Sequence, residues 1–217
     1  MAVPFHDRDG FIWLDGKLVD WRAANIHVLT HALHYASAVF EGIRVYGGKA
    51  FKLRAHNERL IKSAEILGFN IPYTVEQIDA ACVDVIKAMN ITDGYLRPIA
   101  WRGSENMGVS TQGTVIHLAV AVWEWPSYFS PEARAKGIQM ILSPWRRPAP
   151  DTAPVHAKAA GLYMICTIAK NMAEAAGAQD ALMYDYRGFV AEGTGANFFM
   201  VHEDKLHTPT ADCFLNG

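Results

Sequence analysis

The sequence predicts an α+β protein with two domains, and three observations support this prediction. Apolar residues recur at helical spacing in the first half of the chain, beside apolar, β-branched runs typical of strands. A cluster of Pro and Ser residues interrupts the pattern after position 125. In the last third, short apolar runs alternate with turn residues, as in a β-meander. We therefore expect a small N-terminal α/β domain over 1–126, an interdomain linker over 127–137 and a β-rich domain from 138 to 217.

The N-terminal domain is predicted to begin with a β-hairpin. The pair Asp15-Gly16, which favours a tight hairpin turn, separates the apolar runs 11–14 and 17–19. Farther along, apolar residues at helical spacing over 59–67 predict a short helix.

A second helix and two strands complete the expected domain. The helix of 59–67 should end at Gly68, a residue type suited to a helix C-terminus. Thr74 and Gln77 match a capping box, so the next helix should start there and end near Asn90. The β-branched runs 95–101 and 115–125 then predict paired strands.

The second domain is predicted to start with a strand over 138–142. Four prolines between positions 144 and 154 are incompatible with regular structure in that stretch. The proline-free, Ala-rich run 157–176 predicts a long buried helix. The chain should then form a meander with strands near 181–184, 189–190, 197–201 and 206–207.

The composition argues against several partners. With 20 Lys and Arg against 22 Asp and Glu, the net charge is −2, which does not favour nucleic acid or anionic lipid. The longest apolar stretch is shorter than the ~18 residues that suggest a membrane span. Three well-separated cysteines are typical of reduced thiols, so we expect a cytoplasmic protein.

Motif searches leave only a few candidate residues. The sequence lacks the signatures of dinucleotide-binding, P-loop, zincin and hydrolase-elbow proteins. His27, His31 and His34 would share one face if their segment were helical, so a metal site is conceivable. No Cys, Asp or Glu lies in that segment to complete a ligand set, which favours ordinary packing and hydrogen-bonding roles.

Three charged residues are better candidates for chemistry. Lys158 lies among small apolar residues, and desolvation there would favour the free amine that attacks carbonyl carbons. The alternative is a helix lysine that extends to water. Glu192 precedes a Gly-rich turn and could hold a proton on a pyridine nitrogen, or it is a solvated turn residue. Arg59 could bind a phosphate, or it is a surface helix arginine.

The order and context of these residues resemble the fold-type IV pyridoxal-phosphate enzymes, above all the branched-chain amino acid aminotransferases. The resemblance covers nearly the whole chain. The matching segments are His31–Tyr35, Val39–Arg44, Arg54–Ala64, Tyr95–Pro98, Met107–Val109, Ala157–Tyr163 and Glu192–Asn197.

The resemblance implies a role for each cofactor-binding residue. Lys158 would be the catalytic residue and form the Schiff base with pyridoxal 5'-phosphate. Glu192 would pair with the pyridine nitrogen, Tyr163 with the phenolic oxygen and Arg59 with the phosphate, and Gly195 would lie in the cofactor-binding turn.

The resemblance also implies a substrate site and an activity. The site would accept branched-chain L-amino acids and, in exchange, 2-oxoglutarate, whose second carboxylate would meet Arg97. Tyr35 and Val109 match positions used across a subunit interface, which implies a homo-oligomer. The expected substrate-binding residues are Tyr35, Phe40, Gly42, Tyr95, Arg97, Val109, Trp125 and Tyr128.

Other functions remain open at this level. A D-amino acid aminotransferase or an aminodeoxychorismate lyase would share the fold and the lysine, and a non-catalytic relative is a third alternative. The chain ends at Gly217, before the Gly-Ile-Thr turn that binds the cofactor phosphate in the family. We therefore expect that the sequence is a fragment of a longer enzyme whose second domain is incomplete here.

Overall fold

The computed structural model describes residues 3–125 and 131–217. Its contacts divide the chain into two compact units. The first comprises Met1–Pro126 together with Lys158–Gly161, and the second comprises Ser127–Ala157 and Leu162–Gly217. The assignment of Lys158–Gly161 to the first unit differs from the single boundary expected from the sequence.

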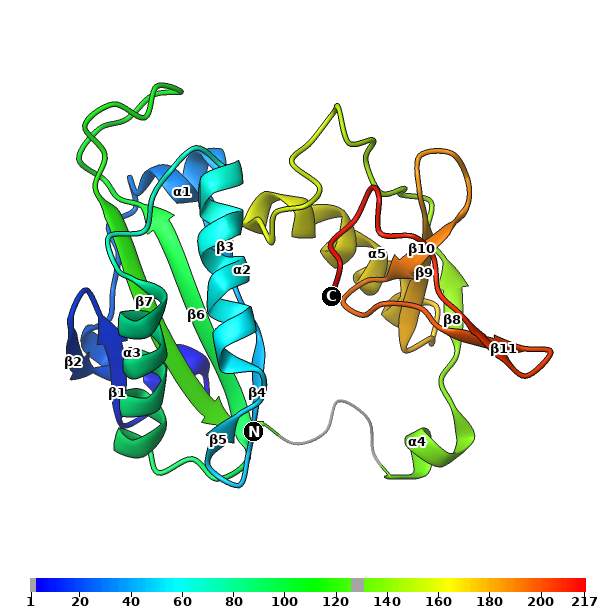
Figure 1. Ribbon diagram of the computed structural model, residues 1–217, viewed down its shortest axis with the longest axis horizontal. Coiled ribbons are helices and arrows are strands. Elements are labelled where there is room, and N and C mark those ends of the chain that lie inside the picture. Colours follow the sequence, from blue (N-terminus) through cyan, green and yellow to red (C-terminus); the bar gives the residue numbers. More distant parts are fainter. Residues whose placement is uncertain (1–2, 126–130) are drawn as a thin grey trace. The chain divides into compact units, whose positions relative to one another are not determined.

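The first unit is built on an antiparallel sheet covered by two helices (Figure 1). In its described part the sheet has seven strands: six pair in the order β2-β1-β7-β6-β4-β5, and the seventh, β3, pairs with β6. The strands are β1 (Phe11–Leu14), β2 (Lys17–Asp20), β3 (Ala38–Phe40), β4 (Ile43–Tyr46), β5 (Lys49–Ala50), β6 (Gly94–Arg102) and β7 (Ile116–Glu124).

The helices of this unit follow the predicted pattern in part. They are α1 (His31–Tyr35), α2 (Leu53–Ile66) and α3 (Val75–Ala88), with single 3-10 turns at Phe5–Asp7 and Trp21–Ala23. The capping box at Thr74 and Gln77 is present, so the predicted start of α3 is confirmed. Gly68 has a φ of 74°, which confirms the predicted end of α2.

The hydrophobic core of the first unit lies between the sheet and helices α2 and α3. Its members are fully buried aliphatic side chains from both layers, such as Leu60, Ile78, Leu96 and Val120. The predicted hairpin is confirmed: β1 pairs with β2 around Asp15 and Gly16, which have φ angles of 46° and 100°.

The second unit contains a three-stranded sheet and a helix. Strands β8 (Met140–Leu142), β9 (Asp180–Tyr184) and β10 (Val190–Gly193) pair in the order β10-β9-β8, with β8 parallel to β9. Helix α5 (Met164–Ala175) packs on β9 through small side chains. A short helix α4 (Pro131–Lys136) precedes the sheet, and strands β11 (Met200–His202) and β12 (Lys205–His207) form a separate ribbon.

The long helix predicted over 157–176 is wrong at its beginning. Helix α5 starts at Met164 and is preceded by a 3-10 turn at Ala160–Tyr163. Residues 158 and 159 are extended instead, because Ala159 forms an antiparallel bridge with Val39 of β3. Backbone pairing with a distant strand has replaced the local helical bonds favoured by the Ala-rich composition.

No helix among the described residues is both long and apolar enough to cross a membrane.

Candidate active site

The two faces of strands β6 and β7 have different side chains. Leu96 and Ala100 of β6 point to the buried core, whereas Tyr95 and Arg97 occupy the opposite face because side chains alternate along a strand. Tyr95 pairs in register with Trp123 of β7, and Arg97 pairs with Ala121. The residue paired with Arg97 therefore has a small side chain.

An aromatic cluster surrounds the Arg97 guanidinium. Its Cζ lies 4.6 Å from the centroid of the Phe40 ring, and its Nη2 donates a hydrogen bond to the Tyr95 hydroxyl at 3.3 Å. The Tyr95 ring in turn lies 5.9 Å from the Trp125 ring, centroid to centroid. Arg97 Nε is buried and has no hydrogen-bond partner within the described ranges. A buried donor on a cation suits a carboxylate ligand.

Gly42 makes room for this cluster. A Cβ atom at this position would overlap the phenol oxygen of Tyr95. Glycine is therefore required by the close approach of the Tyr95 side chain, and not by its own backbone angles.

Lys158 is fixed by its backbone in the first unit. Its N–H donates to Ser63 Oγ of α2 at 2.9 Å, and its carbonyl accepts a hydrogen bond from Phe40 N at 3.1 Å. Lys158 Nζ lies 5.2 Å from the centroid of the Phe40 ring. The amine and the Arg97 guanidinium therefore contact the same aromatic ring.

Arg59 forms a bidentate ion pair with Glu41. Nε and Nη2 of Arg59 donate to the Glu41 carboxylate at 2.7 and 2.8 Å, and His56 Nδ1 lies 2.8 Å from the same carboxylate. Burial alone would raise the pKa of Glu41, but hydrogen bonds from Arg59 and His56 and the nearby charge of Lys158 hold it below its ordinary value of 4.5. Glu41 is therefore ionised at neutral pH.

The second unit contains the other expected cofactor residues. Glu192 lies on β10, and its Oε1 is 3.1 Å from Nε of the buried Arg147. Arg147 also donates to Cys166 Sγ and to the Leu162 carbonyl. This guanidinium stabilises the negative charge of Glu192. Tyr163 ends the 3-10 turn before α5, and Gly195 lies in the turn after β10.

Two expected substrate residues among those described lie outside the aromatic cluster. Tyr35 lies on α1 with 44% of its surface exposed, and its ring contacts that of His31. Val109 lies in the loop between β6 and β7 and is 83% exposed. Tyr128 lies outside the described residues.

The three histidines considered as metal ligands make hydrogen bonds to protein atoms. His31 Nε2 lies 2.9 Å from the Gly108 carbonyl and must donate to it, so Nδ1 accepts from the Ser37 hydroxyl at 2.7 Å. His34 Nε2 donates to the Val28 carbonyl. His27 Nδ1 accepts from Leu29 N. These bonds favour the packing and hydrogen-bonding interpretation.

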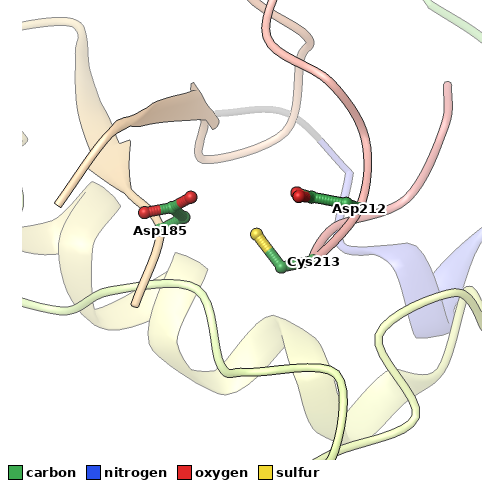
Figure 2. Close-up of side chains that lie close together, drawn as sticks. All are labelled: Asp185, Asp212 and Cys213. Carbon is green, nitrogen blue, oxygen red and sulfur yellow. The ribbon is translucent and has the colours of Figure 1, made fainter. Parts of the chain in front are cut away.

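In the second unit, Asp185, Asp212 and Cys213 lie close together (Figure 2). Arg187 Nη2 pairs with both carboxylates, at 2.6 Å from Asp185 and 2.9 Å from Asp212. Burial, followed by the neighbouring carboxylates, raises the pKa of the Cys213 thiol to about 11, so the thiol is protonated at neutral pH. The negative charge of the two carboxylates is therefore compensated by Arg187, and these ion pairs stabilise the turn after β9.

Four residues that hold the candidate site residues in place were not predicted from the sequence. These are Glu41, His56, Ser63 and Arg147. One signal for Glu41 exists in the sequence, because an acidic residue inside the apolar strand segment Val39–Ile43 needs a buried partner. Ser63 and Arg147 give no such signal, because their partners are distant in the chain.

Similarity to known proteins identifies the family of the chain. The family model described as "Amino-transferase class IV" matches residues 38–217. The chain belongs to the class IV aminotransferases. A "Probable branched-chain-amino-acid aminotransferase" of Rickettsia conorii is 47% identical over 206 residues, which cover 95% of this chain and 70% of that protein.

Solved structures of branched-chain aminotransferases match the chain over nearly all of its length. The enzyme of Escherichia coli superposes with a TM-score of 0.93 at 36% identity, covering 97% of this chain and 71% of that one. The enzyme of the archaeon Thermoproteus uzoniensis, solved with norvaline, gives a TM-score of 0.91 at 36% identity, covering 97% and 71%. Another matching aminotransferase structure contains pyridoxamine 5'-phosphate. The fold class expected from the sequence is confirmed.

Proposed function

We propose that this chain catalyses pyridoxal-phosphate-dependent transfer of the amino group from leucine, isoleucine or valine to 2-oxoglutarate. The observation that carries the proposal is the Phe40 ring, which contacts both the Lys158 amine and the Arg97 guanidinium. A reactive amine thus lies beside a cation suited to a carboxylate. The relatives and solved structures named as branched-chain aminotransferases favour this activity over the D-amino acid aminotransferase and lyase alternatives.

The donor set of the chain fits pyridoxal 5'-phosphate. Lys158 supplies a primary amine for its aldehyde carbon, Arg59 a guanidinium for its phosphate, and Tyr163 a hydroxyl for its phenolic oxygen. Glu192, whose charge Arg147 stabilises, would hold a proton at the pyridine nitrogen. Gly195 would allow backbone to approach the cofactor closely, since nothing lies within 4 Å of the position of a Cβ there. When bound, the cofactor supplies an electron-accepting ring.

The residues of this chain then supply proton transfer and substrate selection. Lys158 Nζ acts as the general base that removes the proton from the substrate Cα. An apolar substrate side chain packs against Phe40, Tyr95 and Trp125, whereas the second carboxylate of glutamate or 2-oxoglutarate pairs with Arg97. Gly42 keeps the Tyr95 ring in this pocket, and Tyr128 is assigned to the same pocket.

The exposure of two residues supports a homo-oligomer. Val109 and Tyr35 are 83% and 44% exposed, and we assign them to a substrate site completed by a neighbouring subunit. The cysteines at 82, 166 and 213 are all unpaired and buried, which supports a reducing, cytoplasmic location. We assign the domains as 1–126 and 138–217 with 127–137 as the linker, except that the segment Lys158–Gly161 groups with the first unit.

A visible absorption spectrum tests the proposed function. Purified chain mixed with pyridoxal phosphate should develop the absorption band of the lysine-bound cofactor. L-Leucine without any oxo acid should abolish the band, and 2-oxoglutarate should restore it. Lys158→Ala should show no band, whereas the matched control Lys87→Ala, on the exposed side of α3, should behave as the wild type. A band that responds to D-alanine but not to L-leucine would contradict the proposal.

A further inference from the structure

Glu41 carries a fully buried charge that the proposed reaction does not use directly. It follows β3, and its side chain reaches α2, where it is 0% exposed. A buried carboxylate is costly unless several cationic donors surround it. Here Arg59 and His56 donate to it, and Lys158 adds a nearby positive charge.

The ion pair determines how the Arg59 guanidinium is oriented. Two parallel hydrogen bonds, from Nε and from Nη2, use one edge of the planar group. A fork of this kind fixes both the plane and the direction of the side chain. The Arg59 side chain is 24% exposed, whereas the Glu41 side chain is completely covered. Of the two partners, only the cation is therefore partly exposed.

We propose that Glu41 is the positioning residue of the cofactor-phosphate site and acts through Arg59. The inference rests on the proposed function, in which Arg59 binds that phosphate. An arginine that is already held in place loses less side-chain freedom when an anion binds. Without Glu41, the Arg59 side chain would lose more conformational freedom when the phosphate binds, and this loss would lower the affinity.

Glu41 could instead oppose phosphate binding through its own negative charge. Two features argue against this. The carboxylate occupies the Nε and Nη2 edge of Arg59, so a phosphate would have to bind another part of the guanidinium. The negative charge of Glu41 is also partly offset by the hydrogen bond from His56 and the nearby positive charge of Lys158. Positioning should therefore exceed repulsion, and removal of the charge should weaken phosphate binding.

The test compares the affinity of two ligands that differ only in the phosphate. Binding of pyridoxal phosphate and of pyridoxal is titrated by absorbance for the wild type, Glu41→Gln and the control Asp79→Asn. Asp79 is a matched control because it also packs a carboxylate against α2, through Asn57 and Arg54, without touching Arg59. Glu41→Gln should lower the affinity for pyridoxal phosphate about tenfold or more and leave the affinity for pyridoxal unchanged. Asp79→Asn should change neither affinity.

A double-mutant cycle separates positioning from general damage. In an Arg59→Ala background, Glu41→Gln should have no further effect on the affinity for pyridoxal phosphate, because the residue through which it acts is missing. If circular dichroism shows that Glu41→Gln is unfolded, Glu41→Asp provides the same comparison. Aspartate keeps the charge, but its side chain is one methylene shorter, so the carboxylate lies farther from Arg59. This variant should also weaken the binding of pyridoxal phosphate and leave that of pyridoxal unchanged.

Other results would overturn the inference. Equal weakening of both ligands would make Glu41 a purely structural residue, and tighter binding of pyridoxal phosphate would make it a competitor. If the wild type binds both ligands and Glu41→Gln changes neither affinity, only the role of Glu41 is wrong. If the wild type binds neither ligand, both this inference and the proposed function are wrong.

Discussion

The turn between β3 and β4 contains two adjacent residues, Glu41 and Gly42, that have different structural requirements. The Glu41 carboxylate requires cationic partners because it is buried, and Gly42 must lack a side chain because the Tyr95 phenol occupies its space. Both demands arise at single positions, and both can be tested by single substitutions.

The stability of the protein should depend on pH through Glu41. Its pKa is lower in the folded state than the ordinary value of 4.5, because Arg59, His56 and Lys158 together outweigh the effect of burial. A carboxylate with a lowered folded pKa contributes stability that is present above its unfolded pKa and is lost as the pH falls through the folded pKa. Below pH 4.5, the free energy of unfolding should therefore fall more steeply for the wild type than for Glu41→Gln in urea titrations. Parallel curves for the two proteins would contradict the assigned ionisation.

Gly42→Ala should affect the dicarboxylic substrate more than the apolar one. The new methyl group would displace the Tyr95 phenol, which accepts a hydrogen bond from Arg97. Because Arg97 is the proposed partner of the second carboxylate, KM for 2-oxoglutarate should rise about tenfold, by the loss of one charge-assisted contact. KM for leucine should change less in steady-state assays. Equal increases in both values would assign the Tyr95 ring a general role in the pocket.

At the scale of elements, helix α2 organises the first unit's part of the site. His56, Arg59 and Ser63 are spaced by three and four residues, so they share one face of the helix. His56 and Arg59 bind Glu41, and Ser63 holds the backbone of Lys158. One helix face thus supports both the proposed phosphate ligand and the proposed catalytic amine.

The beginning of α2 could not be predicted from the sequence, whereas that of α3 could. Helix α3 starts with a capping box, in which Thr74 and Gln77 satisfy each other's backbone N–H groups. Helix α2 begins after Lys52, which has a φ of 53° and no side-chain cap, so no residue marks the start. The hairpin, the pairing of β6 with β7 and the end of α2 follow from local patterns and were predicted.

The site is predictable only as far as its chemistry is local or resembles a family. Local patterns indicated Lys158, Glu192 and Arg59 as candidates and the resemblance implied a role for each, but neither indicated the residues that hold them in place. The partner of Lys158, Ser63, lies 95 positions earlier in the chain, and the partner of Arg59, Glu41, lies 18 positions earlier. Neither distance has a periodic signal in the sequence, because each contact arises only when β3, α2 and the 158–161 segment pack together.

The capping box of α3 should contribute measurably to stability. Thr74→Ala removes the hydroxyl that accepts from Gln77 N, and loss of such a cap costs about 1 kcal/mol. Chemical denaturation should show this decrease in the free energy of unfolding. Thr74→Ser keeps the hydroxyl and is the matched control, which should remain close to the wild type. A similar loss in both variants would attribute the effect to the threonine methyl group instead.

At the scale of the whole molecule, the proposed reaction draws on both compact units. The first unit supplies Lys158, Arg59 and the aromatic cluster around Arg97, and the second supplies Glu192 with Arg147. The residues that we assign to the cofactor are thus distributed over both units. Our proposal also assigns the two exposed residues Tyr35 and Val109 to a site completed by a second copy of the chain.

Val109→Glu should therefore disrupt association of the subunits. Val109 is 83% exposed in the single chain, and an interface that covers it would have to bury the new carboxylate without a partner. Sedimentation equilibrium should give a mass of at least twice 24.0 kDa for the wild type and a shift toward 24.0 kDa for the variant. Val83→Glu, at a 39% exposed position on α3, is the matched control and should leave the mass unchanged. A wild-type protein that stays monomeric at all concentrations would contradict the role assigned to Val109. It would also require the substrate site to be completed within one chain.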